Sequence, residues 1–308
     1  MDARRRLRSQ LCRRLCLWGT AVLVLCALLP AWAGQDCTPR RPTLAAMARD
    51  LDLAVSVAAQ LDELAARDGL RVALLARIGQ DLSAYGLRYT HLGFVYRDTA
   101  ALDGRGAWRV VHKLNQCGSD RAQIYRQGLA EFFGDGLFRH EAGLLPLKDA
   151  DALAPLLTDN ALLALVHEPR YNMLAYPWAG PYQQSNQWVI ETLAVLRDPH
   201  VNSRAEARAW LRGRGYQPAT VPLSAATRLG ARMFTAHISF DDHPFGRRME
   251  GQIDTVTVES VFAWLTRTGL GEPPMALRIR PPTVRARPGR PERAPVPAGA
   301  STISRAPA

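Results

Sequence analysis

Two short segments of the chain carry residue types that could perform acyl-transfer chemistry. In the strand-like run Tyr89-Thr90-His91-Leu92-Gly93, His91 is followed two residues later, on the same face, by Gly93. A glycine at that spacing leaves room for a second group to approach the imidazole. In the other segment, Ser185 stands where an aromatic loop turns into a helix. The free N–H groups of a helix start can stabilise an oxyanion, so Ser185 occupies a position suited to a nucleophile.

A third polar residue, His112, lies on the strand-like run that follows the one carrying His91. If the two runs pair as a hairpin, the histidines lie roughly opposite each other, and His112 can orient the imidazole of His91. Ordinary structural roles fit the same residues, since serine is a favoured helix N-cap and histidine is often half-buried. The catalytic and structural interpretations of Ser185, His91 and His112 therefore both stay open.

The loop at residues 171–182 is rich in aromatic residues, and its prolines bar regular structure. Tyr171, Tyr176 and Tyr182 could line a ligand pocket, each with a hydroxyl as a polar handle. The same rings could instead pack the long loop against the body of the protein. Both roles for the tyrosines stay open.

A metal site is not expected. His237, Asp241, Asp242 and His243 have suitable ligand types, but their spacing matches no familiar metal motif, and Asp-Asp before His-Pro is ordinary turn chemistry. The chain also has no Gly-rich phosphate loop, no Gly-x-Ser-x-Gly elbow and no Cys-x-x-Cys pair. We therefore expect neither a metal ion nor a common cofactor.

The elements that must position these residues follow from apolar periodicity. Residues 43–67 read as a long amphipathic helix with one apolar face, made of Leu44, Met47, Leu51, Val55, Ala58, Leu61 and Leu64. Strands are expected at residues 71–78, 89–97, 108–114, 233–240 and 253–258. Further helices are expected at residues 123–133, 149–157, 160–167, 184–197, 204–213 and 259–267.

The first 33 residues have the three parts of a secretory signal peptide. An arginine-rich start precedes an apolar run at residues 15–29, and Ala31-Trp32-Ala33 supplies a small-x-small cleavage pattern. The run of about 15 residues is shorter than the roughly 20 that span a bilayer as a helix. We expect cleavage near Ala33-Gly34 and a periplasmic or secreted protein with no membrane span. An uncleaved N-terminal anchor is the alternative.

Cleavage would remove three of the five cysteines and leave Cys37 and Cys117. In an oxidising compartment two remaining cysteines predict one disulfide, which would tie the mature N-terminus to a loop about 80 residues away. Two unpaired thiols are the alternative.

The formal charge of +11 is confined to the two ends of the chain. Six arginines against Asp2 give residues 1–33 a net charge of +5, and seven arginines against Glu292 give residues 276–308 a net charge of +6, so residues 34–275 are formally neutral. A neutral body lacks the electrostatic footprint of a nucleic-acid-binding protein. Residues 272–308, rich in Pro, Arg and Ala, are expected to be a disordered tail.

Three runs resemble an exported bacterial family described as domain of unknown function 2145. They are Asp-Leu-Ser-Ala-Tyr-Gly-Leu-Arg-Tyr-Thr-His-Leu-Gly at residues 81–93, Tyr-Asn-Met-Leu-Ala-Tyr-Pro-Trp at 171–178, and Tyr-Gln-Gln-Ser-Asn-Gln-Trp-Val at 182–189. The resemblance covers most of residues 35–268, and the family has no established biochemical role.

The order of a strand histidine followed by a loop-to-helix nucleophile position is also similar to circularly permuted NlpC-type papain-like enzymes. That resemblance implies a permuted papain-like topology, with His91 as general base and Ser185 at the nucleophile position. Those enzymes have a cysteine where this chain has Ser185. A serine depends wholly on its base for activation, whereas a cysteine is partly ionised near neutral pH.

These observations predict an α+β fold: a small, mostly antiparallel sheet packed with helices, in one domain over residues 34–271. Three functions are compatible with it. The first is a degenerate papain-like module that binds a cell-envelope ligand. The second is an active hydrolase or acyltransferase that uses Ser185 and His91 with support from His112. The third is a structural or interaction protein without a site. Its partners are unknown, although nucleic acid is not expected.

Overall fold

The computed structural model describes residues 42–102, 104, 106–134, 138–234 and 237–279. The predicted signal peptide, Cys37 and residues 280–308 of the predicted tail lie outside these residues. Cys117 is disulfide-bonded, but its pairing with Cys37 stays a prediction because Cys37 is not described. No helix in the described ranges is long and apolar enough to cross a membrane.

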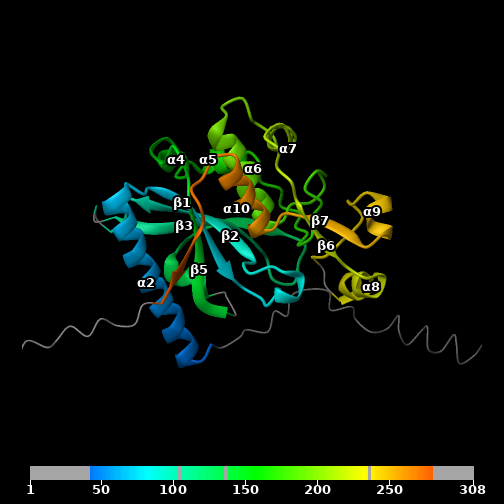
Figure 1. The fold of residues 1–308 in the computed structure, drawn as a ribbon, viewed down its shortest axis with the longest axis horizontal. Coiled ribbons are helices and arrows are strands. Elements are labelled where there is room, and N and C mark those ends of the chain that lie inside the picture. Colours follow the sequence, from blue (N-terminus) through cyan, green and yellow to red (C-terminus); the bar gives the residue numbers. More distant parts are fainter. Residues whose placement is uncertain (1–41, 103, 105, 135–137, 235–236, 280–308) are drawn as a thin grey trace, which may run out of the picture.

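A six-stranded antiparallel sheet with the order β4-β3-β2-β1-β5-β8 forms the centre of the molecule (Figure 1). Its strands are β1 (Val72–Ile78), β2 (His91–Asp98), β3 (Ala107–Asn115), β4 (Ala122–Gly128), β5 (Phe138–Pro146) and β8 (Met275–Arg278). A small second sheet pairs β6 (Ala219–Pro222) with β7 (Gln252–Thr255). With its helices the protein is α+β, which confirms the predicted fold class.

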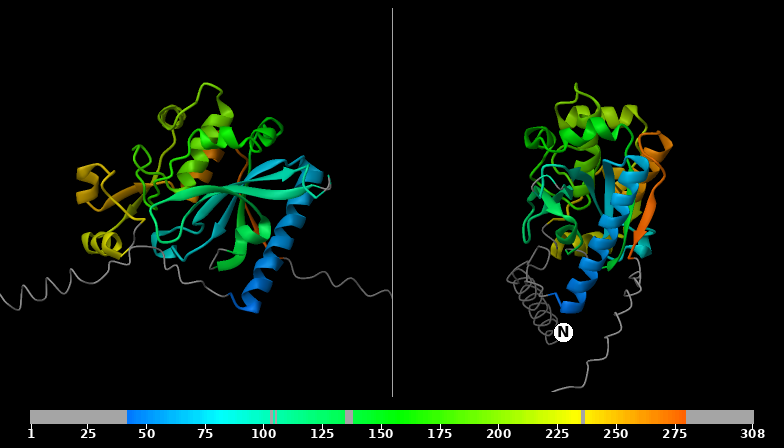
Figure 2. Two further views of the ribbon diagram at one scale, coloured as in Figure 1. Left: turned by 180° about the vertical axis from the view of Figure 1, so that it is seen from behind. Right: turned by 90° about the vertical axis from the view of Figure 1, so that its left-hand side faces the viewer.

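Helices cover both faces of the large sheet (Figure 2). The helices of the described residues are α2 (Leu44–Asp68), α3 (Leu129–Gly134), α4 (Ala150–Leu156), α5 (Asn160–Ala164), α6 (Ser185–Arg197), α7 (Arg204–Gly213), α8 (Ala225–Phe234), α9 (Phe245–Met249) and α10 (Val258–Arg267), with a 3-10 turn at Ser83–Tyr85. Helices α2 and α3 pack on one face, while α6 and α10 pack on the other.

The alternation of side chains along each strand divides the core in two. Leu92 and Phe94 of β2 pack with Trp188 of α6 in one cluster of buried residues. Val95 of β2 packs with Phe132 of α3 in the other cluster. Each buried strand residue therefore faces either the side covered by α6 and α10 or the side covered by α2 and α3, which decides what the polar residues of the same strands can reach.

Two predicted elements are wrong. Residues 123–133 form β4 followed by the short helix α3 instead of one helix, because the long-range pairing of β4 with β3 decides the conformation of Ile124 and its neighbours. The predicted strand at residues 233–240 is not found: residues 233–234 end α8, and residues 237–240 form no strand. The start signal of α8 is Ser224, whose hydroxyl accepts the backbone N–H of Thr227.

The long N-terminal helix is confirmed as α2, but only the second half of its predicted apolar face, at Leu61 and Leu64, is buried. Its buried side chains include Leu53, Val57, Leu61 and Leu64. The first half of the predicted apolar face is instead exposed to solvent: Leu44 is 84% exposed, Met47 46%, Leu51 53% and Val55 68%. The helix thus has two apolar faces, and the sheet covers one of them.

The large sheet extends past the predicted domain boundary at residue 271. Met275–Arg278 forms β8 and pairs antiparallel with β5 at the sheet edge. Leu277 is buried there among residues of α2 and β5. The four residues of β8, Met-Ala-Leu-Arg, directly follow two prolines and are too few to give a recognisable sequence signal for a strand.

Candidate functional site

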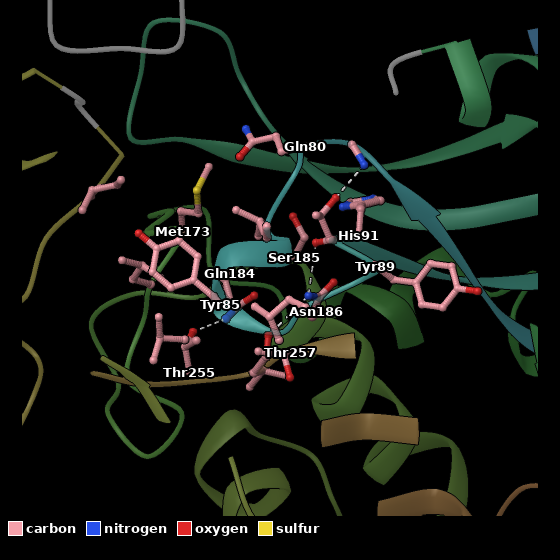
Figure 3. Close-up of a pocket in the computed structure, with 18 of the residues that line it drawn as sticks. Gln80, Tyr85, Tyr89, His91, Met173, Gln184, Ser185, Asn186, Thr255 and Thr257 are labelled. Atoms are coloured by element: carbon pink, nitrogen blue, oxygen red, sulfur yellow. Dashed lines mark hydrogen bonds between the residues drawn. The ribbon is translucent and has the colours of Figure 1, made fainter. Parts of the chain in front are cut away.

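Ser185, His91 and Tyr171 all line one pocket, which has a volume of about 370 Å³ (Figure 3). It opens between the end of the large sheet and the small sheet, with the segment at residues 79–90 along one side. Tyr176 and Tyr182 are not among the described residues that line it. Tyr182 donates to Asp241 at 3.1 Å, and the ring of Tyr176 packs at a tilt against that of His243 with 5.3 Å between ring centres.

The histidines form a buried chain of hydrogen bonds. His91 Nε2 lies 2.7 Å from His112 Nδ1, and His112 Nε2 lies 2.8 Å from Gln127 Oε1 on β4. His112 is opposite Gly93 in the strand register, so it is diagonal to His91 on the same face of the sheet. A Cβ at Gly93 would lie only 2.9 Å from that of His112. The predicted role of Gly93, room for a group beside the imidazole, is confirmed.

These hydrogen bonds fix the tautomer of both histidines. Gln127 Oε1 can only accept, so His112 carries its proton on Nε2 and leaves Nδ1 as an acceptor. His91 must then donate from Nε2, which leaves His91 Nδ1 with a free lone pair. Nδ1 makes no hydrogen bond within the described residues, and His91 is one of the residues lining the pocket. His91 thus has one ring nitrogen able to accept a further hydrogen bond, on a residue that lines the pocket.

Both imidazoles are held neutral. Burial, followed by the nearby charge of Arg77, lowers the pKa of His91 well below its ordinary value. The same two causes lower the pKa of His112 to about 3, against a smaller opposing effect of the Gln127 hydrogen bond. The Arg77 guanidinium donates to the Phe132 carbonyl and lies over the Phe132 ring, 5.0 Å from its centre. The histidines therefore have a cation beside them and no carboxylate partner among the described contacts.

Ser185 is the first residue of α6 and not its N-cap. The N-cap is Gln184, and no side-chain hydrogen bond caps the helix. The structural interpretation of Ser185 as a capping residue is therefore wrong. Ser185 is 6% exposed, and its side chain interacts with the Tyr171 hydroxyl, whose pKa is raised by burial and lowered in part by that interaction.

Ser185 and His91 approach the pocket from different sides of the sheet. The imidazole of His91 lies on the α3 face, with its ring centre 6.0 Å from that of Phe132. Ser185 begins α6, which packs on the opposite face. Within the described residues no hydrogen bond joins Ser185 to His91, so the nucleophile and base suggested by the sequence share a pocket without forming a dyad.

The next residue of the helix, Asn186, is a site residue that the sequence analysis did not single out. Its Nδ2 donates to the carbonyls of Thr90 and Val256, at 3.5 and 3.3 Å. These two acceptors fix the orientation of the amide and leave the buried Oδ1 without a hydrogen-bond partner in the described structure. Asn186 belongs to the run at residues 182–189, but nothing in its residue type or spacing distinguishes it from its neighbours there.

The segment at residues 79–90 is held against the body by two carboxylates. Glu259 Oε1 accepts the backbone N–H groups of Arg88 and Tyr89 at 2.8 and 2.9 Å. Glu141 accepts the Tyr89 hydroxyl at 2.9 Å and pairs with Arg88 and Arg278. Burial raises the pKa of Glu141, but the hydrogen bonds from Tyr89, Arg278 and Arg88 lower it more, so the carboxylate stays ionised.

The start of α6 is held by a second buried polar network. Lys113, next to His112 on β3, donates to Gln183 Oε1 at 2.7 Å and to the Glu168 carbonyl at 2.6 Å. Gln183 in turn donates to Glu191, which pairs with Arg204 at 2.8 Å. This network fixes the loop that leads into Ser185.

The histidines of the cluster His237, Asp241, Asp242 and His243 make contacts of other kinds. His243 uses both ring nitrogens, at 3.0 Å from Asp242 Oδ1 and 3.0 Å from the Asp254 carbonyl. His237 is buried among other residues, 6.1 Å in ring-centre distance from Tyr171. Within the described residues no group of three or more His, Cys, Asp or Glu could hold a metal ion.

Comparison with known proteins identifies a family for the chain but gives no activity. The model of a family described as an uncharacterized protein conserved in bacteria (DUF2145) matches residues 63–265, which is more than half of the chain. No curated protein and no solved structure gives a significant match. The matched range includes the histidine chain, Ser185 and Asn186.

Proposed function

The chain belongs to this bacterial family of uncharacterised proteins, and we propose that it is an exported envelope protein whose pocket binds an uncharged, partly apolar ligand without hydrolysing it. Export is supported by the signal-peptide pattern of residues 1–33. The order of His91 and Ser185, similar to that of papain-like enzymes, supports descent from a catalytic module that has become a binding module.

The observation that carries this proposal is the separation of Ser185 from a weak base. A serine needs its base to accept a proton in the transition state, and that base must then be stable as an imidazolium. His91 is neutral because burial and the Arg77 charge disfavour its protonated form. Its orienting partner is a second neutral histidine instead of a carboxylate. This environment opposes proton abstraction and suits a hydrogen bond to a neutral ligand.

The chemistry of the lining defines the ligand. Of the described lining residues only Arg77 carries a charge, and it already donates to a backbone carbonyl. The acceptors left without a partner, His91 Nδ1 and the buried Asn186 Oδ1, belong to residues that line the pocket, and they favour a ligand with N–H or O–H donors. Apolar side chains such as Leu174 and Leu223 form the outer wall. A neutral amide or alcohol with an apolar chain meets these requirements.

A matched pair of probes tests the ligand class. Octanamide supplies N–H donors and no charge, whereas octanoate has the same chain length and only acceptors. We expect octanamide to bind the purified protein at least about tenfold more tightly than octanoate, as measured by calorimetry and by shifts of pocket amide resonances. Tighter binding of octanoate, through Arg77, would overturn the neutral-ligand proposal.

Two substitutions on α8 test the location. Thr227 is exposed and lines the pocket, and Ala226 is its exposed neighbour outside the lining. Thr227→Trp should fill the outer pocket and abolish octanamide binding, while Ala226→Trp should leave the binding unchanged. Equal affinity in both variants would place the binding elsewhere.

The second candidate function is a serine hydrolase, favoured by the uncapped start of α6 at Ser185. A fluorophosphonate probe, which labels serines activated by a base, distinguishes a hydrolase from a binding protein. The binding proposal predicts no labelling of Ser185 above that of a denatured control. Labelling that disappears in both Ser185→Ala and His91→Gln would instead establish the hydrolase.

A further inference from the structure

The connection between β1 and β2 is a loop of the pocket wall with a closed base. It runs from Gly79 to Thr90, and its ends meet because the Thr90 hydroxyl accepts the backbone N–H of Gly79 at 2.8 Å. The N–H of Thr90 in turn donates to the Arg77 carbonyl at 3.0 Å. The residues between these ends therefore form a compact surface loop whose two ends are fixed to each other.

The tip of this loop, residues 80–87, is held together from within. The Asp81 carboxylate accepts the backbone N–H and the hydroxyl of Ser83, at 3.0 and 2.6 Å. Backbone hydrogen bonds of 2.9 to 3.2 Å join residues 82–83 to residues 85–87. Among the described residues, the tip makes no hydrogen bond or ion pair with the rest of the protein. It is thus a unit that can move without breaking a hydrogen bond.

Firm attachment to the body begins at residue 88. Glu259 Oε1 accepts the backbone N–H groups of Arg88 and Tyr89, at 2.8 and 2.9 Å. The closed base of the loop holds the chain on the other side of the tip. Any motion of the tip is therefore confined to two hinges, at residues 79–80 and 87–88.

The tip covers part of the pocket with three side chains. Leu82, Tyr85 and Leu87 all line the pocket, and none of them belongs to a hydrophobic cluster of the core (Figure 3). Tyr85 is 42% exposed, and the two leucines are half-buried. Because these side chains face the pocket, moving the tip outward leaves the core covered. A segment with so few buried apolar contacts opens at a low free-energy cost.

We propose that residues 80–87 are a hinged lid that opens to admit the ligand and closes over its apolar chain. The proposal rests on the binding function proposed above and assigns the two ends of the ligand. The polar group lies near His91 and Asn186, and the apolar chain lies under Leu82 and Leu87. The bound ligand then supplies the apolar contacts that the tip lacks in the free protein, so binding favours the closed state.

Spin-label distances test the lid in the absence of any ligand. Ala84→Cys places a label on the exposed side of the tip, and Ala209→Cys places one on α7, in the full exported chain, whose Cys117 is disulfide-bonded. Double electron–electron resonance should find at least two distances between these labels in the free protein and one distance with octanamide. The control pair, Ala209→Cys with Ala263→Cys on α10, should give one distance in both states.

The free protein and the complex test different statements. A single distance between positions 84 and 209 in the free protein would overturn the lid, whatever octanamide does. Two distances in a free protein that does not bind octanamide would confirm the hinged tip and overturn the proposed ligand class. Two distances that persist with octanamide bound would show a loop that does not close on the ligand, which would overturn the lid.

Shortening the loop tests whether the tip controls entry. Replacing residues 81–87 by Asn-Gly joins β1 to β2 through a short turn, because this dipeptide favours tight hairpins. The variant should keep the wild-type circular dichroism spectrum, and octanamide should associate with it and dissociate from it at least about tenfold faster in stopped-flow measurements. Ala84→Ser, on the exposed side of the tip, should leave both rates unchanged. Wild-type rates in the shortened variant would overturn the lid, and if that variant does not fold, the spin-label distances decide.

Discussion

Two buried polar networks start from adjacent residues of β3 and run in opposite directions through the sheet. His112 points to the α3 face, where it connects His91 to Gln127. Lys113 points to the α6 face, where it connects Gln183 to the loop at Glu168. The first network is neutral and ends in a pocket-lining acceptor, whereas the second combines charges of both signs and stays enclosed.

The difference separates a binding network from a structural one. A closed network whose charges compensate each other holds the chain in place, and removing one member leaves the others buried and unpaired. A neutral network with one unsatisfied atom at a cavity has hydrogen-bonding capacity left for a ligand. We therefore expect substitutions in the Lys113 network to change the free energy of unfolding and substitutions in the His112 network to change binding.

The largest effect is expected at Glu191, which is fully buried and pairs with Arg204. Glu191→Ala leaves the cations Arg204 and Arg208 without their carboxylate, so the free energy of unfolding should fall by roughly 3–5 kcal/mol, as measured by urea denaturation. Glu272→Ala is the control, because its ion pair with Lys148 is about half exposed and should contribute no more than about 1 kcal/mol. Similar losses in both variants would mean that the Glu191 network is not structural.

Lys113 should give the closed network a pH signature. Burial, and then the charge of Arg204, lower its pKa from 10.5 to about 7, against the opposing effects of Glu191 and Glu168. Below pH 7 the lysine is protonated in both states. Between pH 7 and 10.5 the unfolded chain binds a proton that the folded chain does not, so stability should rise with pH by up to about 1.4 kcal/mol per unit.

Lys113→Met removes that proton from both states, so the rise in stability above pH 7 should disappear. The exposed Lys148→Met is the matched control and should keep the rise. Urea denaturation at pH 7, 8 and 9 measures the slope. A slope that persists in Lys113→Met would assign it to another group.

The sequence was informative wherever a signal was local. The hairpin that carries His91 and His112, the helix that starts at Ser185 and the role of Gly93 all follow from short runs of residue types. Much of the α+β architecture was therefore predictable from periodicity and turn residues alone.

The parts that sequence reasoning missed depend on contacts between distant residues. Gln127 became part of the site only because β4 pairs with β3, while its own segment reads as helical. Arg77 reaches the histidines from another strand, and its effect on their pKa values has no counterpart in local spacing. On α2 two apolar faces exist in one sequence, so periodicity could not decide which of them meets the sheet.

The smallest effect on stability is expected at Gln127. A substitution there tests the difference between the two networks directly, because it changes the His112 network without disturbing the fold. Gln127 is half-buried, so Gln127→Leu should cost no more than about 1 kcal/mol of unfolding free energy. Without its acceptor, His112 gains more by donating from Nδ1 to His91 Nε2. His91 would then carry its proton on Nδ1 and offer the pocket a donor.

Long-range ¹H–¹⁵N spectra at pH 7 distinguish these tautomers. The wild type should show protonated Nε2 on both histidines, and Gln127→Leu should shift His91 towards protonated Nδ1 and weaken octanamide binding. Gln123→Leu, an exposed position on the same strand, should change neither quantity. If Gln127→Leu keeps the wild-type tautomers, the tautomer of His91 is determined by its surroundings in the pocket and not by its hydrogen bonds through His112 to Gln127. The neutral network would then be as purely structural as the charged one on the other face.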